Sequence, residues 1–290
     1  MAIKILITGA NGGFGKLTVK TLLEKGHQVA ATLRDPKGRN RQVAEELMQA
    51  GANIIDMDVT NDESVTHGVE QALAELNGLD VLVNNAGTGT LGMQEFFTTS
   101  DYQKLFDVNV FGVQRLNRAV IPYFRKNHKG LIIYISSLLG RIAMPFYGPY
   151  QSSKWALEAM AENYRVELSS FGIENCIVEP GGYPTTFMDN LLRPSDGSRE
   201  DSYGDFLQYP EQMFQSFENV LQNNPQQNPQ RVADAVTDLI EKPVGGKPFR
   251  TTVDFIGMGD SVKAYNDHLE QLTTGLYTNF GMNDLLSVKP

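Results

Sequence analysis

The sequence predicts a doubly wound α/β fold, in which helices cover both faces of a parallel β-sheet. Short apolar runs rich in valine and isoleucine alternate with longer helical patterns through the first two-thirds of the chain, an order typical of βαβ units. No stretch before residue 182 resembles an interdomain linker. We therefore expect a single α/β domain over residues 1–290.

Each apolar run is expected to form one strand of the sheet. A short run of this kind, bounded by helical patterns, suits a strand that is buried on both faces. The run at residues 251–256 follows a helical pattern at residues 231–240 and is expected to add an edge strand. The other expected strands are residues 3–7, 28–33, 53–57, 81–83, 131–135 and 173–178.

The character of the sequence changes from residue 182 to about residue 230, where aromatic residues and methionines are interspersed with polar ones. We interpret this segment as an insertion, its polar end at residues 222–230 as a solvated loop, and residues 258–290 as a C-terminal tail. Apolar residues here and just before Tyr150 would form a lid suited to a bulky hydrophobic ligand, with core packing or a subunit interface as the alternative. They are Leu138, Leu139, Met144, Phe146, Tyr147, Phe187, Met188, Leu191, Leu192, Tyr203, Phe206, Met213, Phe214 and Phe217.

Composition and charge exclude several classes of function. The 290 residues are 41% hydrophobic and 20% charged, as in ordinary soluble proteins. The net charge of −9 gives no basic surface for nucleic acid or for an anionic membrane. No apolar run approaches the ~20 residues of a membrane span, and no signal-peptide pattern precedes the first run.

The cysteine and histidine residues point to no covalent or metal chemistry. The single cysteine, Cys176, lies in an apolar run and is expected to pack there, which is compatible with a reducing compartment. The four histidines lack the spacing of metal ligands, so we expect no metal site. Together these features predict a cytoplasmic protein.

Tyr150 and Lys154 form the most informative pair in the sequence. The preceding Pro149 predicts a helix N-terminus, because the N–H that proline lacks would be unbonded there, and this places Tyr150 in the first turn. Residues four apart share a helical face, so the phenol and the ammonium can enter one cleft. A nearby positive charge favours the phenolate and lowers the tyrosine pKa from about 10. Such a tyrosine can act as the general acid or base of a carbonyl/alcohol interconversion.

A glycine-rich turn, Thr8-Gly9-Ala10-Asn11-Gly12-Gly13-Phe14-Gly15, joins the first expected strand to a helix at residues 16–25. Glycine allows a pyrophosphate to approach main-chain N–H groups and the positive end of the helix dipole. We therefore expect a dinucleotide site at this turn. The spacing fits G-x-x-x-G-x-G through Gly9, Gly13 and Gly15, and also G-x-x-G-x-x-G through Gly9, Gly12 and Gly15. The turn alone does not distinguish these two patterns.

The end of the second expected strand favours a phosphorylated cofactor. An acidic residue there would bond the ribose hydroxyls of NAD, but Leu33 occupies that place. Arg34 can pair with a 2′-phosphate and stack on adenine, so we expect NADP(H). The next residue, Asp35, keeps NAD(H) as the alternative, in which case Arg34 would belong to a solvated charged loop with Lys37 and Arg39.

Further motifs follow in a fixed order and carry a family resemblance. Asp58-Val59 follows the third expected strand, Asn84-Asn85-Ala86-Gly87 ends the fourth, and Asn109 lies in Asp107-Val108-Asn109-Val110-Phe111-Gly112. Ser137 precedes Tyr150, and Pro180-Gly181 with Thr185 follows the sixth expected strand. With the glycine turn and the Tyr150/Lys154 pair, this order resembles the short-chain dehydrogenase/reductase family from residue 3 to about residue 185. Two departures are Ser152, where the family usually has alanine, and Tyr183-Pro184 in the nicotinamide loop.

The resemblance implies a Rossmann-type domain of the family's short form, which selects the first glycine spacing, and a role for each matching residue. Tyr150 would exchange a proton with the substrate oxygen, and Ser137 would hydrogen-bond that oxygen. Lys154 would bond the nicotinamide ribose, and Asn109 would hold a water that links Lys154 to solvent. The implied cofactor contacts are Thr8, Gly9, Asn11, Gly13, Phe14, Gly15, Arg34, Asp58, Val59, Asn85, Ala86, Gly87, Tyr150, Lys154, Pro180, Gly181, Tyr183 and Thr185.

Several of these residues also have a purely structural interpretation. Ser137 could close a turn while its neighbour Ser136 takes the catalytic place. Asn109 could bond the backbone at a helix kink, with or without a catalytic role. Asp58 could cap the helix that follows it.

The sequence therefore predicts an NADP(H)-dependent oxidoreductase that interconverts a hydrophobic ketone or aldehyde and its alcohol. The alternative is a non-catalytic protein that senses a dinucleotide, because a fold does not fix a function. The complete set of Asn109, Ser137, Tyr150 and Lys154 favours the enzyme. The resemblance also implies a homodimer or homotetramer, with interfaces built by the helices that bear Asn109 and Tyr150.

Overall fold

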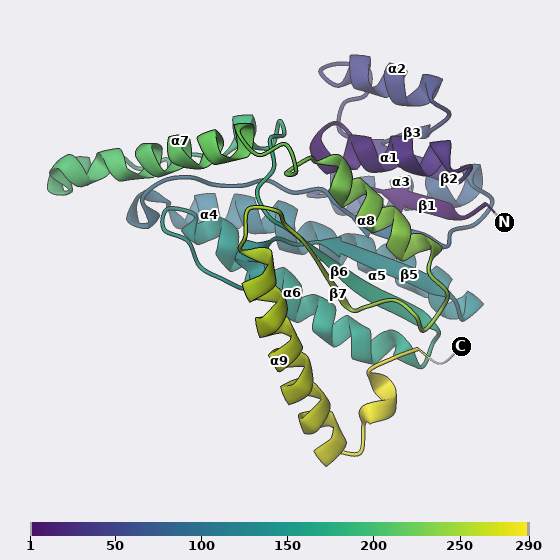
Figure 1. The fold of residues 1–290 in the computed structure, drawn as a ribbon. Coiled ribbons are helices and arrows are strands. Elements are labelled where there is room, and N and C mark those ends of the chain that lie inside the picture. Colours follow the sequence, from purple (N-terminus) through teal and green to yellow (C-terminus); the bar gives the residue numbers. More distant parts are fainter. Residues whose placement is uncertain (1, 289–290) are drawn as a thin grey trace.

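A parallel sheet of seven strands forms the centre of the protein in the computed structural model, which describes residues 2–288 (Figure 1). The strand order is β3-β2-β1-β4-β5-β6-β7, and every neighbouring pair is parallel. All the expected strands are present, and the last one is an edge strand as predicted. They are β1 (Lys4–Ile7), β2 (Gln28–Leu33), β3 (Asn53–Asp56), β4 (Val81–Asn84), β5 (Gly130–Ile135), β6 (Ile173–Pro180) and β7 (Arg250–Val253).

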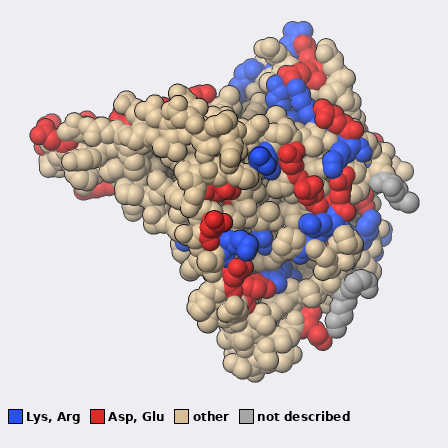
Figure 2. All heavy atoms as spheres, viewed as in Figure 1, with Lys and Arg blue, Asp and Glu red and all other residues tan. Residues whose placement is uncertain are grey.

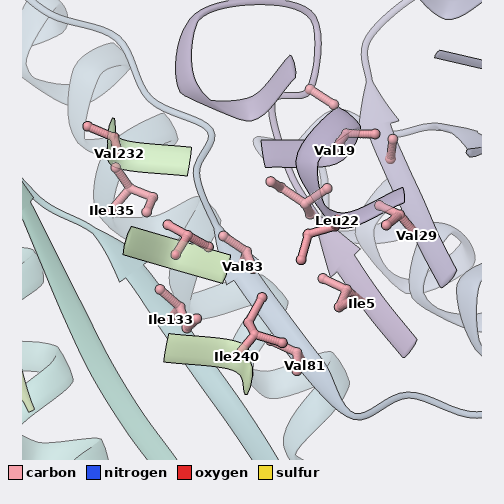
Figure 3. Packing of buried hydrophobic residues seen from close by; sticks show 14 of the residues in the cluster. Ile5, Val19, Leu22, Val29, Val81, Val83, Ile133, Ile135, Val232 and Ile240 are labelled. Carbon is pink, nitrogen blue, oxygen red and sulfur yellow. The ribbon is translucent and has the colours of Figure 1, made fainter. Parts of the chain in front are cut away.

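Helices cover both faces of the sheet, which confirms the doubly wound fold. Successive side chains of a strand point to opposite faces, so Ile5 and Leu6 of β1 enter different hydrophobic clusters. In Figure 3, Ile5 and Val29 of the sheet lie near Leu22 of the helix on one face. That face is covered by α1 (Gly13–Glu24), α2 (Arg41–Gln49) and α8 (Gln230–Glu241), and the other by α3 (Asp62–Glu75), α5 (Gly112–Asn127) and α6 (Gly148–Ser169).

Two long helices lie outside these layers. The predicted insertion contains α7 (Tyr209–Gln222), which extends away from the sheet as an arm (Figure 1). The visible surface of this arm is mostly uncharged, with acidic side chains at its tip (Figure 2). The segment predicted as a tail contains α9 (Gly259–Asn279), which contacts β7 and is tied to α6 by an ion pair between Arg165 and Glu270.

The polar end of the insertion is not simply a solvated loop, as the sequence suggested. Gln227 is buried, and its amide donates to the carbonyl oxygen of Gly182 and to Oδ1 of Asp254. Its Oε1 accepts a 2.8 Å bond from the backbone N–H of Phe255. This glutamine thus joins the start of the insertion to the end of β7. Composition did not reveal this, because the partners lie far away in the sequence.

A buried network of charged side chains joins α6 to the β6/β7 edge of the sheet and to α9. Arg141 pairs with Glu158, Glu162 and Glu179, and Arg250 pairs with the same three carboxylates. Two further donors bond Oε2 of Glu179, the hydroxyl of Thr252 at 2.9 Å and the amide of Asn266 at 2.6 Å. Three carboxylates therefore surround two guanidinium groups, which leaves one excess negative charge at a site where Glu158 and Glu179 are fully buried.

The excess charge predicts an unusual pH dependence of stability. Burial and the neighbouring Glu158 raise the pKa of Glu179 from its ordinary value near 4.5 to about 7. Between these values the folded protein holds a proton that the unfolded chain has released, so this group's contribution to the free energy of unfolding falls as pH rises. We expect wild type to lose on the order of 2 kcal/mol relative to Glu179→Gln between about pH 5 and about pH 8.

Urea unfolding of both proteins at the two pH values measures this difference, since other carboxyl groups affect both proteins alike. A difference in unfolding free energy that stays constant with pH would show that Glu179 is ionised throughout.

Candidate active site

The predicted site residues gather at the carboxyl ends of the central strands. The chain runs from β1 to β2 and β3 on one side and continues with β4 on the other, so the strand order reverses between β1 and β4. Loops that leave neighbouring strands at such a point diverge, and the crevice between them is the usual ligand site of open α/β sheets. The glycine turn follows β1, and residues 84–87 follow the adjacent strand.

The glycine turn is shaped to receive an anion. Gly9 and Gly13 have φ angles of +67° and +50°, which side chains disfavour, and a Cβ on Gly15 would lie 2.4 Å from the carbonyl oxygen of Gly9. The helix begins at Gly13, earlier than predicted. Its N-cap, Gly12, offers no side-chain bond, and its first turn has no acidic residue. The positive end of the helix dipole is thus left for a ligand, and these residues fit a dinucleotide pyrophosphate.

Hydrogen bonds fasten the turn to the end of β4. The hydroxyl of Thr8 accepts bonds from the backbone N–H groups of Asn85 and Ala86, at 3.1 and 3.0 Å. The side-chain amide of Asn85 donates to the carbonyl oxygens of Thr8 and Gly9. Ala86 also packs against Gly9, where a Cβ would come within 2.8 Å of its Cα. Thr8 and Asn85 therefore shape the crevice.

Arg34 lies at the end of β2 beside a cavity of about 520 Å³. Its side chain is 53% exposed and lies 3.8 Å from the Asp58 carboxylate. Asp58 accepts bonds from the N–H and hydroxyl of Thr60, and the N-cap of α3 is Asn61, so the suggestion that Asp58 caps this helix is wrong. The neighbouring Val59 is buried against the start of α5.

The carboxylate of Asp35 is already used within its own loop. Asp35 has a φ of +50°, and its Oδ2 accepts a 2.9 Å bond from the backbone N–H of Arg39. Its own N–H donates to Oδ1 of Asp56. The residue that kept NAD(H) as an alternative therefore closes a turn in this structure.

The loop after β6 arches over the glycine turn. The N–H of Gly181 donates to the carbonyl oxygen of Val253, and Thr185 lies 3.7 Å from the position of a Cβ on Gly13. The Tyr183 ring is buried, meets Phe14 edge-on at 5.4 Å, and its hydroxyl donates to the carbonyl oxygen of Val253. The side chain of Tyr183 thus belongs to the core and leaves only its backbone for the cofactor contact that the sequence predicted.

Tyr150 lies in the first turn of α6, as predicted from Pro149. Its backbone N–H donates to Thr90 Oγ1 at 3.2 Å, and the Ser137 side chain lies close enough to its hydroxyl to oppose the rise of its pKa. Ser137 also closes a turn after β5, because its Oγ accepts a 3.1 Å bond from the N–H of Leu139. The structural and the chemical interpretations of Ser137 are therefore compatible. Ser136 is buried beside Gly140.

Lys154 lies one turn further along α6 and reaches back to β5. Its ammonium donates a 2.8 Å bond to the carbonyl oxygen of Ile135 and lies 5.7 Å from the centroid of the Tyr150 ring. Burial lowers the pKa of Lys154 to about 8 and raises that of Tyr150 to about 12, an effect that the Ser137 side chain only partly opposes. The phenol pKa is thus raised in this structure and not lowered as expected, because burial disfavours the charged phenolate.

Asn109 lies in a π-helical segment, Asp107–Phe111, between α4 (Thr99–Phe106) and α5. Its Oδ1 accepts from the N–H of Thr88, and its amide donates to the carbonyl oxygen of Thr88 and to Oγ of Ser153, each at 2.9 Å. Asn109 therefore bonds the backbone, as the structural interpretation held, and the amide fixes the loop after β4 against α6. A π-helical turn shifts the hydrogen-bond ladder locally, an irregularity common at functional sites.

One apolar side chain of the insertion packs against the phenol ring of Tyr150. The Phe187 ring lies 5.8 Å from that of Tyr150. A cavity of about 480 Å³ separates the glycine turn from the insertion, with Met188 and Leu221 in its walls. A hydrophobic cluster beside it comprises Leu91, Leu139, Met144, Phe146, Tyr147, Met188, Leu191, Met213 and Phe214.

Sequence reasoning missed the residues that hold this site together. Thr88 and Thr90 anchor Asn109 and Tyr150, Ser153 bonds the amide of Asn109, and Thr186 lies over the glycine turn at Gly12. Their one signal was proximity to the predicted motifs.

Cys176 is buried as expected, and the structure from residue 2 to residue 288 contains neither a group of histidine, cysteine or acidic side chains that could hold a metal nor a helix able to span a membrane.

Comparisons with known proteins agree with this geometry. A family model described as short chain dehydrogenase matches residues 4–196. A 3-ketodihydrosphingosine reductase from Bacteroides thetaiotaomicron is 40% identical over 204 residues, which are 70% of this chain and 72% of that protein. Retinol dehydrogenase 8 from Bos taurus is 34% identical over 244 residues, 81% of this chain and 77% of that protein. The crystal structure of a short-chain dehydrogenase from Streptomyces avermitilis has a TM-score of 0.75 and 27% identity, and covers 97% of this chain and 98% of its own.

Proposed function

The chain belongs to the short-chain dehydrogenase/reductase family, and from that premise we propose that it interconverts a hydrophobic ketone or aldehyde and its alcohol with NADP(H). Membership makes the chain an oxidoreductase that acts on CH–OH groups with a nicotinamide dinucleotide. The cofactor preference, the substrate class and the residue roles are the new elements of the proposal. The observation that carries the residue roles is the convergence of Tyr150, Ser137 and Lys154 at the end of β5.

The residues divide the chemistry as follows. A bound nicotinamide dinucleotide supplies hydride in reduction and accepts it in oxidation. Tyr150 is protonated near neutral pH, so its hydroxyl can give a proton to the substrate oxygen as that oxygen gains charge. Ser137, whose side chain lies beside the phenol, donates to the same oxygen and stabilises the charge.

Lys154 and Asn109 support Tyr150 and Ser137 without contacting the reacting oxygen. The ammonium of Lys154 adds a positive charge close to the developing phenolate, and charges in a dry site interact strongly. Asn109 holds the loop after β4 against the helix that bears Tyr150 and Lys154, and we propose that its segment also binds the water that returns protons from solvent. A purely sensing protein would have no use for this assembly, so the enzyme is favoured.

The substrate class follows from the walls of the site. Side chains around the phenol come from the apolar cluster of the insertion and the loop before α6. Apolar walls of this kind favour ligands with little charge and a large apolar surface. The names of the two relatives, a 3-ketodihydrosphingosine reductase and a retinol dehydrogenase, are consistent with a hydrophobic carbonyl or alcohol.

The NADP(H) preference rests on the contrast between Arg34 and Asp35. The guanidinium of Arg34 is half exposed beside a cavity, whereas the Asp35 carboxylate is bonded within its own turn. A half-exposed guanidinium with one long ion pair to Asp58 can form a charge-assisted bond with a 2′-phosphate, and an acceptor that is already engaged is poorly placed for ribose hydroxyls. The cytoplasmic location and the homo-oligomeric state stay predictions. Phe111 and Trp155 are exposed on the segments that are expected to form the subunit interfaces.

Calorimetric titration with NADPH and NADH tests the cofactor preference. We expect wild type to bind NADPH more tightly, and Arg34→Ala to weaken NADPH binding by about 10-fold to 100-fold while NADH binding changes little, because only NADPH carries the 2′-phosphate. Arg41→Ala is the matched control, since Arg41 loses the same charge but pairs with Glu45 on an exposed helix. Preference of wild type for NADH, with no selective effect of Arg34→Ala, would contradict the proposal.

A further inference from the structure

The hydroxyl of Tyr147 is buried and has no hydrogen-bond partner among residues 2–288. A buried donor without a partner costs about 1–3 kcal/mol relative to a satisfied one. Phenylalanine would fill the same space without this cost. The phenol is therefore a feature that the fold alone does not explain.

Tyr147 belongs to the hydrophobic cluster that forms a wall of the proposed substrate site. It precedes Tyr150 by one turn of chain and belongs to the cluster in which Leu91 meets Met188 and Phe214 of the insertion. The phenol is close enough to Tyr150 for the two to influence each other's ionisation. Burial raises the pKa of Tyr147 to about 12, so its hydroxyl keeps its proton and can donate or accept a hydrogen bond.

The backbone is strained at the residue directly before this phenol. Phe146 has a φ of +68°, a conformation that is rare for a bulky side chain. Its carbonyl oxygen accepts a 2.9 Å bond from the N–H of Gly92, and its ring packs against Phe206 of the insertion. Strain of this kind persists where the surroundings enforce it, often at ligand sites. Here it fixes the loop that carries Tyr147 between the insertion and the start of α6.

We propose that the Tyr147 hydroxyl binds a second polar group of the substrate, and so selects carbonyl compounds that carry a hydroxyl or amino group close to the reacting carbonyl on an otherwise apolar chain. This inference rests on the proposed function. Tyr147 is a specificity residue and not a second general acid, because Ser137 and Lys154 are arranged around Tyr150. Without substrate the apolar side chains of the insertion cover the phenol, and a substrate with a matching group satisfies it.

The test compares long-chain ketones with the same ketones carrying a hydroxyl group one, two or three carbons from the carbonyl. We expect wild type to favour one of the hydroxyketones in kcat/KM, and Tyr147→Phe to reduce this ratio by about 10-fold to 100-fold. Thermal unfolding supplies a second readout, because Tyr147→Phe removes an unsatisfied donor and should unfold at the same or a higher temperature than wild type.

Tyr134→Phe is the matched control, because Tyr134 is buried in the core and its hydroxyl bonds Asn117 and Asn175. It should lower the unfolding temperature and leave the kcat/KM ratio unchanged. An unchanged ratio in Tyr147→Phe, or a loss of stability like that of Tyr134→Phe, would overturn the inference. If wild type reduces none of the ketones, the proposed substrate class fails. The Tyr147 inference is then decided by whether hydroxyketones raise the unfolding temperature of the cofactor-loaded wild type more than that of Tyr147→Phe.

Discussion

A Tyr150→Phe variant is expected to bind the dinucleotide as wild type does and to lose about 10²-fold to 10⁴-fold in kcat, which is the usual contribution of a positioned acid or base. The phenol is protonated near neutral pH and lies beside Ser137, so it is placed to give its proton to a substrate oxygen. Phenylalanine keeps the ring that packs against Phe187 and removes only the hydroxyl group. The loss should therefore appear in kcat and leave cofactor affinity unchanged.

The loss of kcat is measured as the rate at which NADPH is consumed during reduction of a hydrophobic ketone. Calorimetry measures the affinity for the cofactor. Tyr265→Phe is the matched control, because Tyr265 is 42% exposed on α9 and far along the chain from the site. It should keep wild-type activity. A Tyr150→Phe protein that retains more than about a tenth of kcat would assign the proton transfer to another group, since general acid–base catalysis is worth more than this.

The sequence was sufficient for the sheet and for most of the site because both depend on local signals. Strands buried on both faces require continuous apolar runs, and each run is visible in about six residues. Pro149 marked the start of α6, and four-residue spacing placed Tyr150 and Lys154 on one face. Glycines mark turns that no other residue can form, so the dinucleotide turn was equally visible.

What the sequence did not predict depends on burial and on distant partners. A lysine four residues from a tyrosine indicated a lowered phenol pKa, but both groups are desolvated in the structure and the phenol pKa rises instead. Tyr183 lies in a loop that was expected to bind the cofactor, yet its hydroxyl donates to the edge strand. Gln227 lies in a polar tract that was expected to be a solvated loop, yet its side chain joins two segments of the chain. In each case the deciding partner is tens of residues away, where no periodicity connects the two.

The buried charge network shows this limit most clearly and leads to the second large effect. Its members come from the turn after β5, α6, β6, β7 and α9, and separately each resembles an ordinary surface charge. In the structure Arg141 is 6% exposed and pairs with three carboxylates. Removing it leaves Glu158 and Glu179 buried with Arg250 as their one remaining guanidinium among the described residues. We expect Arg141→Met to lower the free energy of unfolding by about 3–5 kcal/mol.

Urea unfolding of the variant measures this loss, with Arg41→Met as the control. Arg41 forms a close pair with Glu45, at 2.7 Å, but both side chains are more than half exposed, so its removal should cost less than about 1 kcal/mol. Solvent screens the charge that Arg41 leaves behind, whereas Glu158 and Glu179 beside Arg141 are fully buried.

Adding Glu179→Gln to Arg141→Met separates lost charge balance from lost packing. The double variant has one buried carboxylate fewer, so it should recover part of the stability if the uncompensated negative charge is the cause. If the loss came from the arginine stem, which methionine largely replaces, the second substitution would recover nothing. Equal costs for Arg141→Met and Arg41→Met would mean that water enters the network and screens it. The same result would also undermine the raised pKa of Glu179, because that shift arises mainly from the exclusion of water.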